Sequence, residues 1–172
     1  SGGRIVGAML GNDVNLRDFE GRSALLLSKA KDNNASCAVG PLLRLFDRTF
    51  SLDDVRNMDV DLIVRGPDGF VLEGRSSISR ISRDPTDLVA QTIGPEHQYP
   101  DGFALFLGTM FAPVKDRDTQ GQGFTHKRDD IVTIASPQLG RLTNRMRTSG
   151  ECEPWTFGVS ALMKSLAARK LL

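Results

Sequence analysis

The chain has 172 residues, a length that suits one domain with a single sizeable hydrophobic core. Apolar residues make up 40% and charged residues 25%, and 22 basic side chains stand against 21 acidic ones, which excludes disorder by excess charge and an overall basic field for nucleic acid. No apolar run approaches the roughly 20 residues that cross a bilayer, and the N-terminus does not resemble a signal peptide. We therefore expect one domain over residues 1–172, in the cytoplasm, with neither a nucleic acid nor a membrane as partner.

Cysteine and histidine are both scarce. Cys37 and Cys152 lack the spacing of a metal-binding or redox motif, which favours reduced thiols. His97 and His126 are the two histidines of the chain, too few for a multi-histidine metal site and little material for a Ser-His-Asp arrangement. We therefore expect carboxylates and lysines to carry the chemistry.

The first third of the chain predicts two strands and a short helix. Residues 4–11 are apolar and end at a Gly-Asn-Asp turn, which indicates a mostly buried strand. Residues 37–46 are apolar as well, and because Pro41 has no N–H for a central ladder, we expect this strand to start after it. Ser51 followed by two aspartates is typical of an N-cap, with a helix to about Met58.

The middle of the chain gives the clearest local pattern. Residues 60–64 alternate in polarity, residues 66–69 read Gly-Pro-Asp-Gly, and an apolar run follows, which predicts an antiparallel hairpin. Asp84 before Pro85 is typical of a helix start, and this helix is expected over 85–93.

The last third predicts strands, a long loop and a terminal helix. We expect a buried strand over 103–107, a surface loop over 115–127 and a second hairpin over 131–142 that bends at Pro137. A terminal helix packed by one face is predicted by apolar residues at helical spacing, namely Val159, Leu162, Met163 and Leu166. Strands outnumber helices, so the predicted fold class is mainly β: a mixed or antiparallel β fold with peripheral helices.

The segment from Gly11 to Cys37 has an unusual density of ionisable side chains. Asp13 stands where a strand is expected to end, a rigid place for a carboxylate that a hard cation such as Mg²⁺ would accept as a ligand. From spacing alone, the alternative that Asp13 caps a turn is favoured. Lys29 and Lys31, by residue type alone, would be solvated loop charges.

These motifs resemble a known family. The residues that carry the resemblance are Gly11-Asn12-Asp13-Val14-Asn15-Leu16-Arg17-Asp18, Lys31, Ser36-Cys37 and Leu107-Gly108-Thr109. Together they resemble the C-terminal catalytic domain of the fumarylacetoacetate hydrolase superfamily, over nearly the whole chain. The resemblance implies that superfamily's mainly β fold and a magnesium-dependent enzyme.

Four further stretches resemble one branch of that superfamily, the bacterial 2-keto-3-deoxy-pentonate (xylonate or arabinonate) dehydratases. These stretches are Phe19-Glu20-Gly21 and residues 29–34, 97–102 and 121–127. The resemblance therefore implies a lyase of sugar acid catabolism, which takes a small 2-keto acid as substrate.

The metal site that the resemblance implies is incomplete in this sequence. Asp13 matches the third carboxylate of the family's Mg²⁺ site, and the other two ligands form a Glu-x-Glu motif on the preceding strand. No such motif precedes Asp13, because the first glutamate of the chain is Glu20. The chain thus resembles an N-terminally truncated fragment that lacks the Glu-x-Glu strand and the N-terminal domain, and alone it is expected to bind metal weakly or not at all.

The resemblance also implies roles for residues around the substrate. Lys31 matches the active-site lysine, where a cation would stabilise an enolate, and Lys29 is the competing candidate. Gly108 and Thr109 match the Gly-Thr whose backbone and hydroxyl donate to the substrate's carboxylate or keto oxygen. Arg17 matches an arginine that either binds a carboxylate or supports the structure.

The implied reaction starts with Mg²⁺ chelated by the substrate's carboxylate and 2-keto oxygen. Loss of the C3 proton gives an enolate held by the metal and Lys31, and loss of the C4 hydroxyl then gives a 2-ketoglutarate semialdehyde-type product. The base is open between Glu20, which departs from the hydrolase pattern and could equally be an exposed loop acid, and the missing glutamates. For His97 an ordinary loop position is favoured, whereas His126 is evenly balanced between such a position and a lid beside the pocket.

Two other functions stay open. The first is hydrolysis of a C–C bond in an acylpyruvate with the same metal and Lys31. The second is a non-catalytic dimerisation fragment, since proteins of this fold normally bury strands in a homodimer. We expect a homodimer or a higher homo-oligomer in each case.

Overall fold

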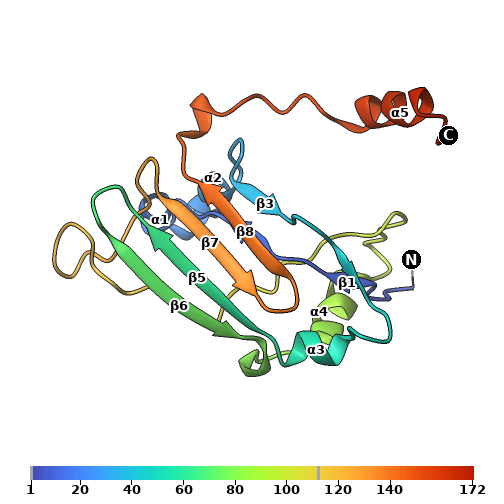
Figure 1. Ribbon diagram of the computed structural model, residues 1–172, viewed down its shortest axis with the longest axis horizontal. Coiled ribbons are helices and arrows are strands. Elements are labelled where there is room, and N and C mark those ends of the chain that lie inside the picture. The colour runs from blue at the N-terminus through green and yellow to red at the C-terminus, as the bar shows by residue number, and fades with distance from the viewer. Residues whose placement is uncertain (1, 112) are drawn as a thin grey trace.

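A four-stranded antiparallel sheet forms the centre of the computed structural model, which describes residues 2–111 and 113–172 (Figure 1). The strand order is β6-β5-β7-β8. The strands are β5 (Asp59–Arg65), β6 (Val71–Ser77), β7 (Ile131–Ser136) and β8 (Gly140–Arg145). The mainly β, antiparallel class with peripheral helices is confirmed.

Both predicted hairpins are confirmed, because local turn chemistry sets them. β5 pairs with β6 around a turn in which the N–H of Gly66 donates to the carbonyl of Phe70 across 2.8 Å. Gly69 in this turn has a φ of +80°, which glycine adopts without strain. Gly140 has the same kind of backbone, at φ +78°, where the second hairpin enters β8.

Two small strand pairs lie outside the main sheet. β1 (Gly7–Ala8) pairs with β4 (Arg44–Leu45), and β2 (Gly11–Asp13) pairs with β3 (Cys37–Val39). The predicted buried strand over 4–11 is therefore wrong: the chain forms two short strands, and Leu10 alone among these residues is buried. Each strand has a single partner among the described residues.

The expectation that pairing starts after Pro41 is also wrong. β3 ends before the Gly40-Pro41 pair and β4 begins after it. Proline thus lies between two ladders, where no ladder N–H is needed, and it interrupts the pairing without preventing either part.

Short helices surround the strands. The segment between β2 and β3 forms α1 (Arg17–Glu20), η1 (Ala24–Leu26) and α2 (Leu27–Lys31), and 3-10 turns η2 (Ile78–Arg80) and η3 (Ser149–Glu151) occur later. Both predicted helix starts are confirmed in α3 (Leu52–Arg56) and α4 (Pro85–Thr92). No helix among the described residues has both the length and the apolar character to cross a membrane.

The caps explain why α3 and α4 begin where they do. Ser51 and Asp54 form a reciprocal capping box at α3, and the Asp84 carboxylate accepts the N–H of Thr86 at α4 across 2.9 Å. Each cap satisfies N–H groups that the first turn would otherwise leave unpaired. These are local interactions, so the sequence alone predicts them.

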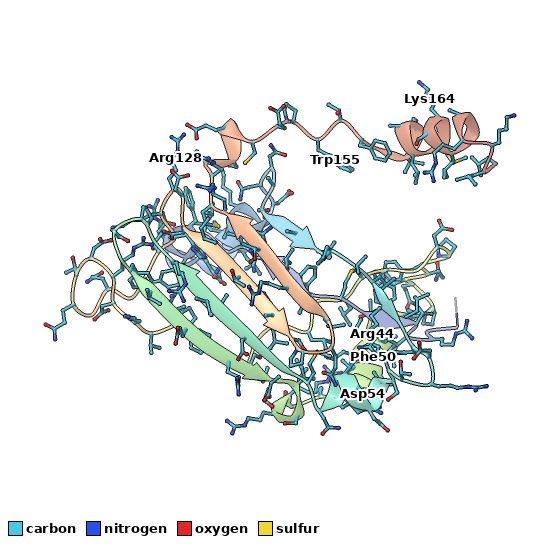
Figure 2. The ribbon with its side chains drawn as sticks, in the orientation of Figure 1. Arg44, Phe50, Asp54, Arg128, Trp155 and Lys164 are labelled. Atoms are coloured by element: carbon cyan, nitrogen blue, oxygen red, sulfur yellow. The ribbon has the colours of Figure 1, made fainter. Side chains whose placement is uncertain are left out.

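Two apolar clusters hold the body together. The first joins α3 to the end of the sheet and contains Phe50, Val55, Met58 and Ile78. Arg44 covers the ring of Phe50 at 4.2 Å, and Figure 2 shows both beside α3. The second lies on one face of the sheet and contains Val64, Leu72, Phe124 and Val132.

The predicted buried strand over 103–107 is wrong. These residues have no regular structure, and Leu105 and Phe106 are 38% and 41% exposed. The Phe106 ring lies against Gly11, where an added Cβ would be 2.3 Å from a ring carbon. The segment thus meets β2 through a side chain, which leaves the backbones without a ladder between them.

The terminal helix forms, but it does not pack as predicted. α5 (Val159–Ala168) has no buried residue, and Leu162 is 44% exposed. Figure 1 shows α5 away from the sheet, at the end of an extended segment after η3. Trp155 on that segment is 81% exposed (Figure 2). The apolar spacing therefore predicted the helix correctly and its partner incorrectly.

Candidate active site

A large open cavity of about 1360 Å³ lies beside the sheet. Its lining comes from β1, β2, residues 100–111 and apolar side chains of β5 and β7. Polar groups are fewer, and those the argument uses are Asp13, Asn15, Arg17, Lys31, Thr109 and His126. An apolar cavity with a few convergent polar groups is the usual form of a small-molecule site.

Asp13 and Lys31 meet in this cavity. Asp13 ends β2 and Lys31 ends α2, and the lysine Nζ donates to the Asp13 carboxylate across 2.7 Å. The position of Lys31 is held by Ser36, whose hydroxyl donates to the Lys31 carbonyl. Lys29 is not among the lining residues of the cavity, so the geometry favours Lys31 of the two candidates.

Asp13 fits one position of a metal site. Its carboxylate is 42% exposed and is a hard oxygen ligand of the kind Mg²⁺ takes. Among residues 2–111 and 113–172, no group of three acidic, histidine or cysteine side chains could hold a metal ion. Among the described residues, Asp13 is therefore a single candidate ligand and not part of a complete metal site.

Gly108 and Thr109 line the same cavity. Gly108 has a φ of +75°, in the left-handed region that favours glycine. The hydroxyl oxygen of Thr109 accepts the N–H of Phe111 across 3.1 Å. Its own hydrogen is then available to a substrate oxygen, in keeping with the donor role predicted for this residue.

Arg17 supports a neighbouring loop. Its guanidinium donates to the carbonyls of Pro113 and Phe124, across 3.1 Å and 3.5 Å. These bonds tie α1 to the segment that approaches β7. Two roles were predicted for Arg17, binding a carboxylate and supporting the structure. These contacts fit the structural role.

Glu20 lies at the end of α1. Its carboxylate accepts a hydrogen bond from the Asn15 side chain, whose own carbonyl oxygen is buried with no partner in the part of the chain that the structure describes. Glu20 is not among the residues that line the cavity, although Asn15 is. Glu20 therefore contacts a residue of the cavity wall, Asn15, but does not line the cavity itself.

The loop over 115–127 is anchored on itself and on the body. Asp116 accepts the N–H groups of Gly121 and Gly123 across 2.8 Å and 2.7 Å, and these bonds lower the pKa of Asp116. The backbone lies at the surface as predicted. The Arg117 side chain, however, turns inward and is only 1% exposed.

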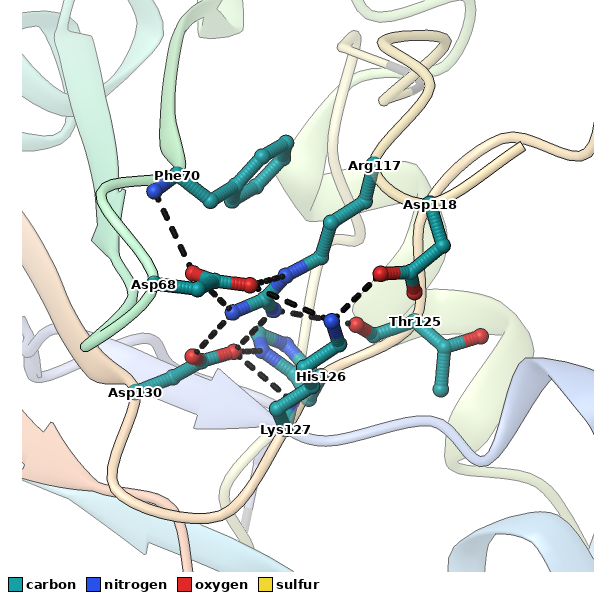
Figure 3. Close-up of polar contacts among 8 residues, drawn as sticks. All are labelled: Asp68, Phe70, Arg117, Asp118, Thr125, His126, Lys127 and Asp130. Atoms are coloured by element: carbon teal, nitrogen blue, oxygen red, sulfur yellow. Dashed lines mark hydrogen bonds and ion pairs between the residues drawn. The ribbon is translucent and has the colours of Figure 1, made fainter. Parts of the chain in front are cut away.

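Arg117 joins two carboxylates that are distant in sequence (Figure 3). It donates to both oxygens of Asp130, across 2.7 Å and 2.8 Å, and to both oxygens of Asp68, across 3.0 Å and 2.9 Å. Lys127 also binds Asp68, across 3.1 Å. The network fixes the loop to the β5–β6 turn and to the start of β7.

The network also determines charge states. Hydrogen bonds from Arg117 hold the pKa of Asp68 well below its usual value. Burial alone would raise the pKa of Asp130, but hydrogen bonds from Arg117 and the Lys127 backbone keep it below its usual value. Burial lowers the pKa of His126, against the opposing effect of Asp130. Both aspartates are therefore anionic, and the imidazole neutral, near pH 7.

No spacing rule could have found this network. Asp68 and Asp130 lie 49 and 13 positions from Arg117, in separate elements. The available signal was the charge density of residues 116–118 and 127–130, which is equally typical of a solvated loop. His97 is exposed and does not line the cavity, as its predicted loop position implies.

The mainly β fold, with the Asp13–Lys31 pair and the Gly108–Thr109 segment on one cavity, has the features that the motifs imply for a catalytic domain of fumarylacetoacetate hydrolase type. No family model matches the chain. Two curated relatives do. The chain is 27% identical over 145 residues to 2-dehydro-3-deoxy-D-arabinonate dehydratase of Saccharolobus solfataricus, covering 83% of this chain and 44% of the relative.

The second relative is a probable 2-keto-3-deoxyxylonate dehydratase of Haloferax volcanii, 25% identical over 146 residues, with 85% of this chain and 47% of the relative covered. The chain thus spans about half the length of the curated relatives it matches. The resemblance to sugar acid dehydratases of this superfamily is confirmed.

Solved structures agree. A hexagonal crystal form of 2-keto-3-deoxyarabinonate dehydratase matches with a TM-score of 0.69 at 27% identity, covering 84% of this chain and 48% of that one. A structure of 2-keto-3-deoxy-D-arabinonate dehydratase complexed with magnesium and 2,5-dioxopentanoate matches with a TM-score of 0.67 at 27% identity, covering 83% and 47%. The fold is therefore that of these dehydratase chains over the matched half.

Proposed function

We propose that the protein is a lyase that dehydrates a 2-keto-3-deoxy-pentonate to a 2-ketoglutarate semialdehyde-type product. One observation carries the proposal: Lys31, Asp13, Gly108 and Thr109 line a single cavity in a chain similar to sugar acid dehydratases. The solved relative with 2,5-dioxopentanoate holds a product of this type.

Each residue has a role that its position allows. The Thr109 hydroxyl and the backbone at Gly108 bind the substrate's carboxylate or keto oxygen. The Lys31 ammonium stabilises the enolate that forms when the C3 proton leaves, because a fixed cation is worth most where negative charge develops. Asp13 is the ligand that the described residues offer to Mg²⁺, which when bound acidifies the C3 proton by drawing charge from the keto oxygen.

Arg17 and Glu20 complete the set that we propose. Arg17 holds the loop segment around Phe124 against α1, so it keeps that side of the cavity in place. Glu20 acts through Asn15, which it holds at the cavity wall, or on a sugar hydroxyl. Exchange of Glu20 for glutamine separates the two roles, since the amide can still bond to Asn15 but cannot accept a proton.

Product analysis tests the proposal. The full-length protein, with Mg²⁺, is offered 2-keto-3-deoxy-pentonates and acylpyruvates in parallel. We expect the semialdehyde from a pentonate and no cleavage of the acylpyruvates. Release of pyruvate from an acylpyruvate would keep the site and assign a C–C hydrolase. No product from either, together with dimerisation, would favour the non-catalytic alternative.

We also propose a homodimer and a cytoplasmic location. Apolar side chains of the β3–β4 segment are open to solvent, with Leu42 at 75% and Leu45 at 59% exposure, and such a surface favours association. Cys37 and Cys152 are both free thiols, which suits a reducing compartment. Size-exclusion chromatography with light scattering measures the molar mass in solution. The mass of a monomer would contradict the proposed dimer.

A further inference from the structure

Asn15 carries a side-chain oxygen without a hydrogen-bond donor at the wall of the large cavity. Its Nδ2 donates to the Glu20 carboxylate, while its Oδ1 is buried and has no partner among residues 2–111 and 113–172. A carboxylate only accepts hydrogen bonds, so the contact with Glu20 fixes which end of the amide is the nitrogen. The free end of Asn15 is therefore an acceptor, and a buried acceptor without a donor is costly in free energy.

Backbone contacts place Asn15 beside Lys31. The N–H of Leu16, the residue after Asn15, donates to the carbonyl of Ala30, the residue before Lys31, across 3.0 Å. The Nζ of Lys31 in turn lies 2.7 Å from the Asp13 carboxylate. Asn15 thus belongs to the same group of side chains as the ion pair, and this placement follows from hydrogen bonds rather than from the cavity alone.

Asn15 and Asp13 also point to the same side of the chain. The ladder between β2 and β3 continues past Asp13, because the N–H of Val14 donates to the carbonyl of Ser36 across 3.0 Å. Side chains alternate along an extended segment, so residues two positions apart share one side. Both Asp13 and Asn15 line the cavity accordingly. A ligand that reaches Asp13 or Lys31 therefore passes close to the Asn15 amide.

The chemistry of the substrate decides which group could donate to Oδ1. In a 2-keto-3-deoxy-pentonate the carboxylate and the keto oxygen are acceptors, and the hydroxyls at C4 and C5 are the donors. The C4 hydroxyl leaves as water and needs a proton donor, which a carbonyl oxygen cannot be. The oxygen at C5 stays in the product. Its hydroxyl is the group that an acceptor beside the reacting carbons suits.

We propose that Asn15 determines specificity for a hydroxylated 2-keto acid by accepting a hydrogen bond from the C5 hydroxyl, and that Glu20 positions the amide; this rests on the proposed function. Binding of such a substrate supplies the donor that Oδ1 lacks. A 2-keto acid without the hydroxyl leaves Oδ1 unpaired, and a site with an unpaired buried acceptor discriminates against that ligand. Asn15 thus selects the substrate and takes no part in proton transfer.

Two ligands that differ in one hydroxyl test the proposal. 2-Oxopentanoate and 5-hydroxy-2-oxopentanoate share the carboxylate and the keto group, and neither has a C4 hydroxyl to lose as water. Each is titrated by calorimetry into the full-length protein with Mg²⁺, for the wild type and for Asn15→Leu. We expect the substitution to weaken binding of the hydroxylated ligand by about 10-fold more than binding of 2-oxopentanoate, as for loss of one hydrogen bond.

The ratio of the two affinities separates specificity from support of the fold. If Asn15 only held α1 to β2, Asn15→Leu would weaken both ligands equally or neither, and either result would overturn the proposal. Ring closure of the free hydroxylated ligand cancels, since the same ligand meets both proteins. Asn33→Leu is the matched control, because Asn33 is also half-buried, donates to the Lys29 carbonyl across 2.9 Å and does not line the cavity. It should keep the wild-type ratio.

Turnover distinguishes this proposal from the proposed function. In Asn15→Leu we expect the KM for a 2-keto-3-deoxy-pentonate to rise by about 10-fold while kcat changes little. If the wild type forms no semialdehyde, the proposed function fails, and the two affinity ratios still decide the role of Asn15. Asn15→Ala covers a leucine variant that does not fold, since it removes the amide without adding bulk. An affinity ratio equal to that of the wild type in Asn15→Ala would contradict the proposal.

Discussion

The Nζ of Lys31 lies 2.7 Å from Oδ2 of Asp13, so the last residue of α2 is ion-paired with the last residue of β2, 18 positions earlier. The two side chains are 33% and 42% exposed, which means that water screens the pair. Because the pair is weakly held, Lys31 can bind a substrate oxygen, and Asp13 a cation, at little cost in free energy. The contact thus keeps both groups at the cavity without locking them together.

Removing the Lys31 charge should abolish most of the activity. In Lys31→Met we expect kcat to fall by about 10² to 10³, the usual effect of losing one group that stabilises an oxyanion. Steady-state assays of semialdehyde formation measure it. Lys29→Met is the matched control on the same helix and should keep the wild-type rate. Equal losses in the two variants would contradict the assignment of Lys31.

Exchange of Asp13 for asparagine should remove Mg²⁺ binding. The amide keeps the shape but loses the charged oxygen that a hard cation prefers. Isothermal titration of the full-length protein with MgCl₂ measures the affinity. Asp18→Asn, an exposed carboxylate on α1 that does not line the cavity, serves as control. Unchanged Mg²⁺ binding in Asp13→Asn would rule out this ligand.

The buried contact between Arg117 and Asp130 should matter for stability. Their side chains are 1% and 0% exposed, and removing one partner of a buried ion pair costs about 3–5 kcal/mol. We therefore expect Arg117→Met to lower the free energy of urea unfolding by about 3–5 kcal/mol. Arg75→Met removes an exposed pair with Asp61 and should cost much less. Similar losses would mean that the Arg117 network does not persist in solution.

Acid should destabilise the protein in two stages. The pKa of folded His126 is below about 6.5, its unfolded value, so its contribution to stability is present above that pH and is lost as the pH falls below it. The pKa of folded Asp130 is below about 3.9, so its contribution is lost only under further acidification. Urea unfolding at several pH values should show the first loss in the wild type and not in His126→Gln.

Loss of α5 should leave the stability of the body unchanged. None of its residues is buried, so deletion of residues 158–172 exposes no core. We expect the free energy of urea unfolding to change by less than about 0.5 kcal/mol, as for surface changes away from special contacts. Dilute protein is used for the measurement, so that association does not contribute. A clear loss would show that α5 packs on the body in solution.

Features that rest on local chemistry could be predicted from the amino-acid sequence. The turns at Gly66–Gly69 and before Gly140, and the caps at Ser51 and Asp84, depend on residues a few positions apart, and each was predicted correctly. The helix over 159–168 follows from spacing in the same way. The resemblance to the dehydratases was likewise readable from short motifs, namely residues 19–21, 29–34, 97–102 and 121–127.

Features that depend on contacts between distant parts of the chain could not be predicted from local patterns. Apolar spacing predicts that α5 has an apolar face, but it cannot say whether another surface covers it, and none of the described residues buries it. The run over 103–107 is apolar enough for a strand, yet a strand exists only where another backbone offers a ladder. Arg117 reaches Asp68 and Asp130 because the fold brings three separate elements together. No local propensity encodes such a meeting, since the ion pairs and hydrogen bonds that offset the cost of burying these charges join residues far apart in sequence.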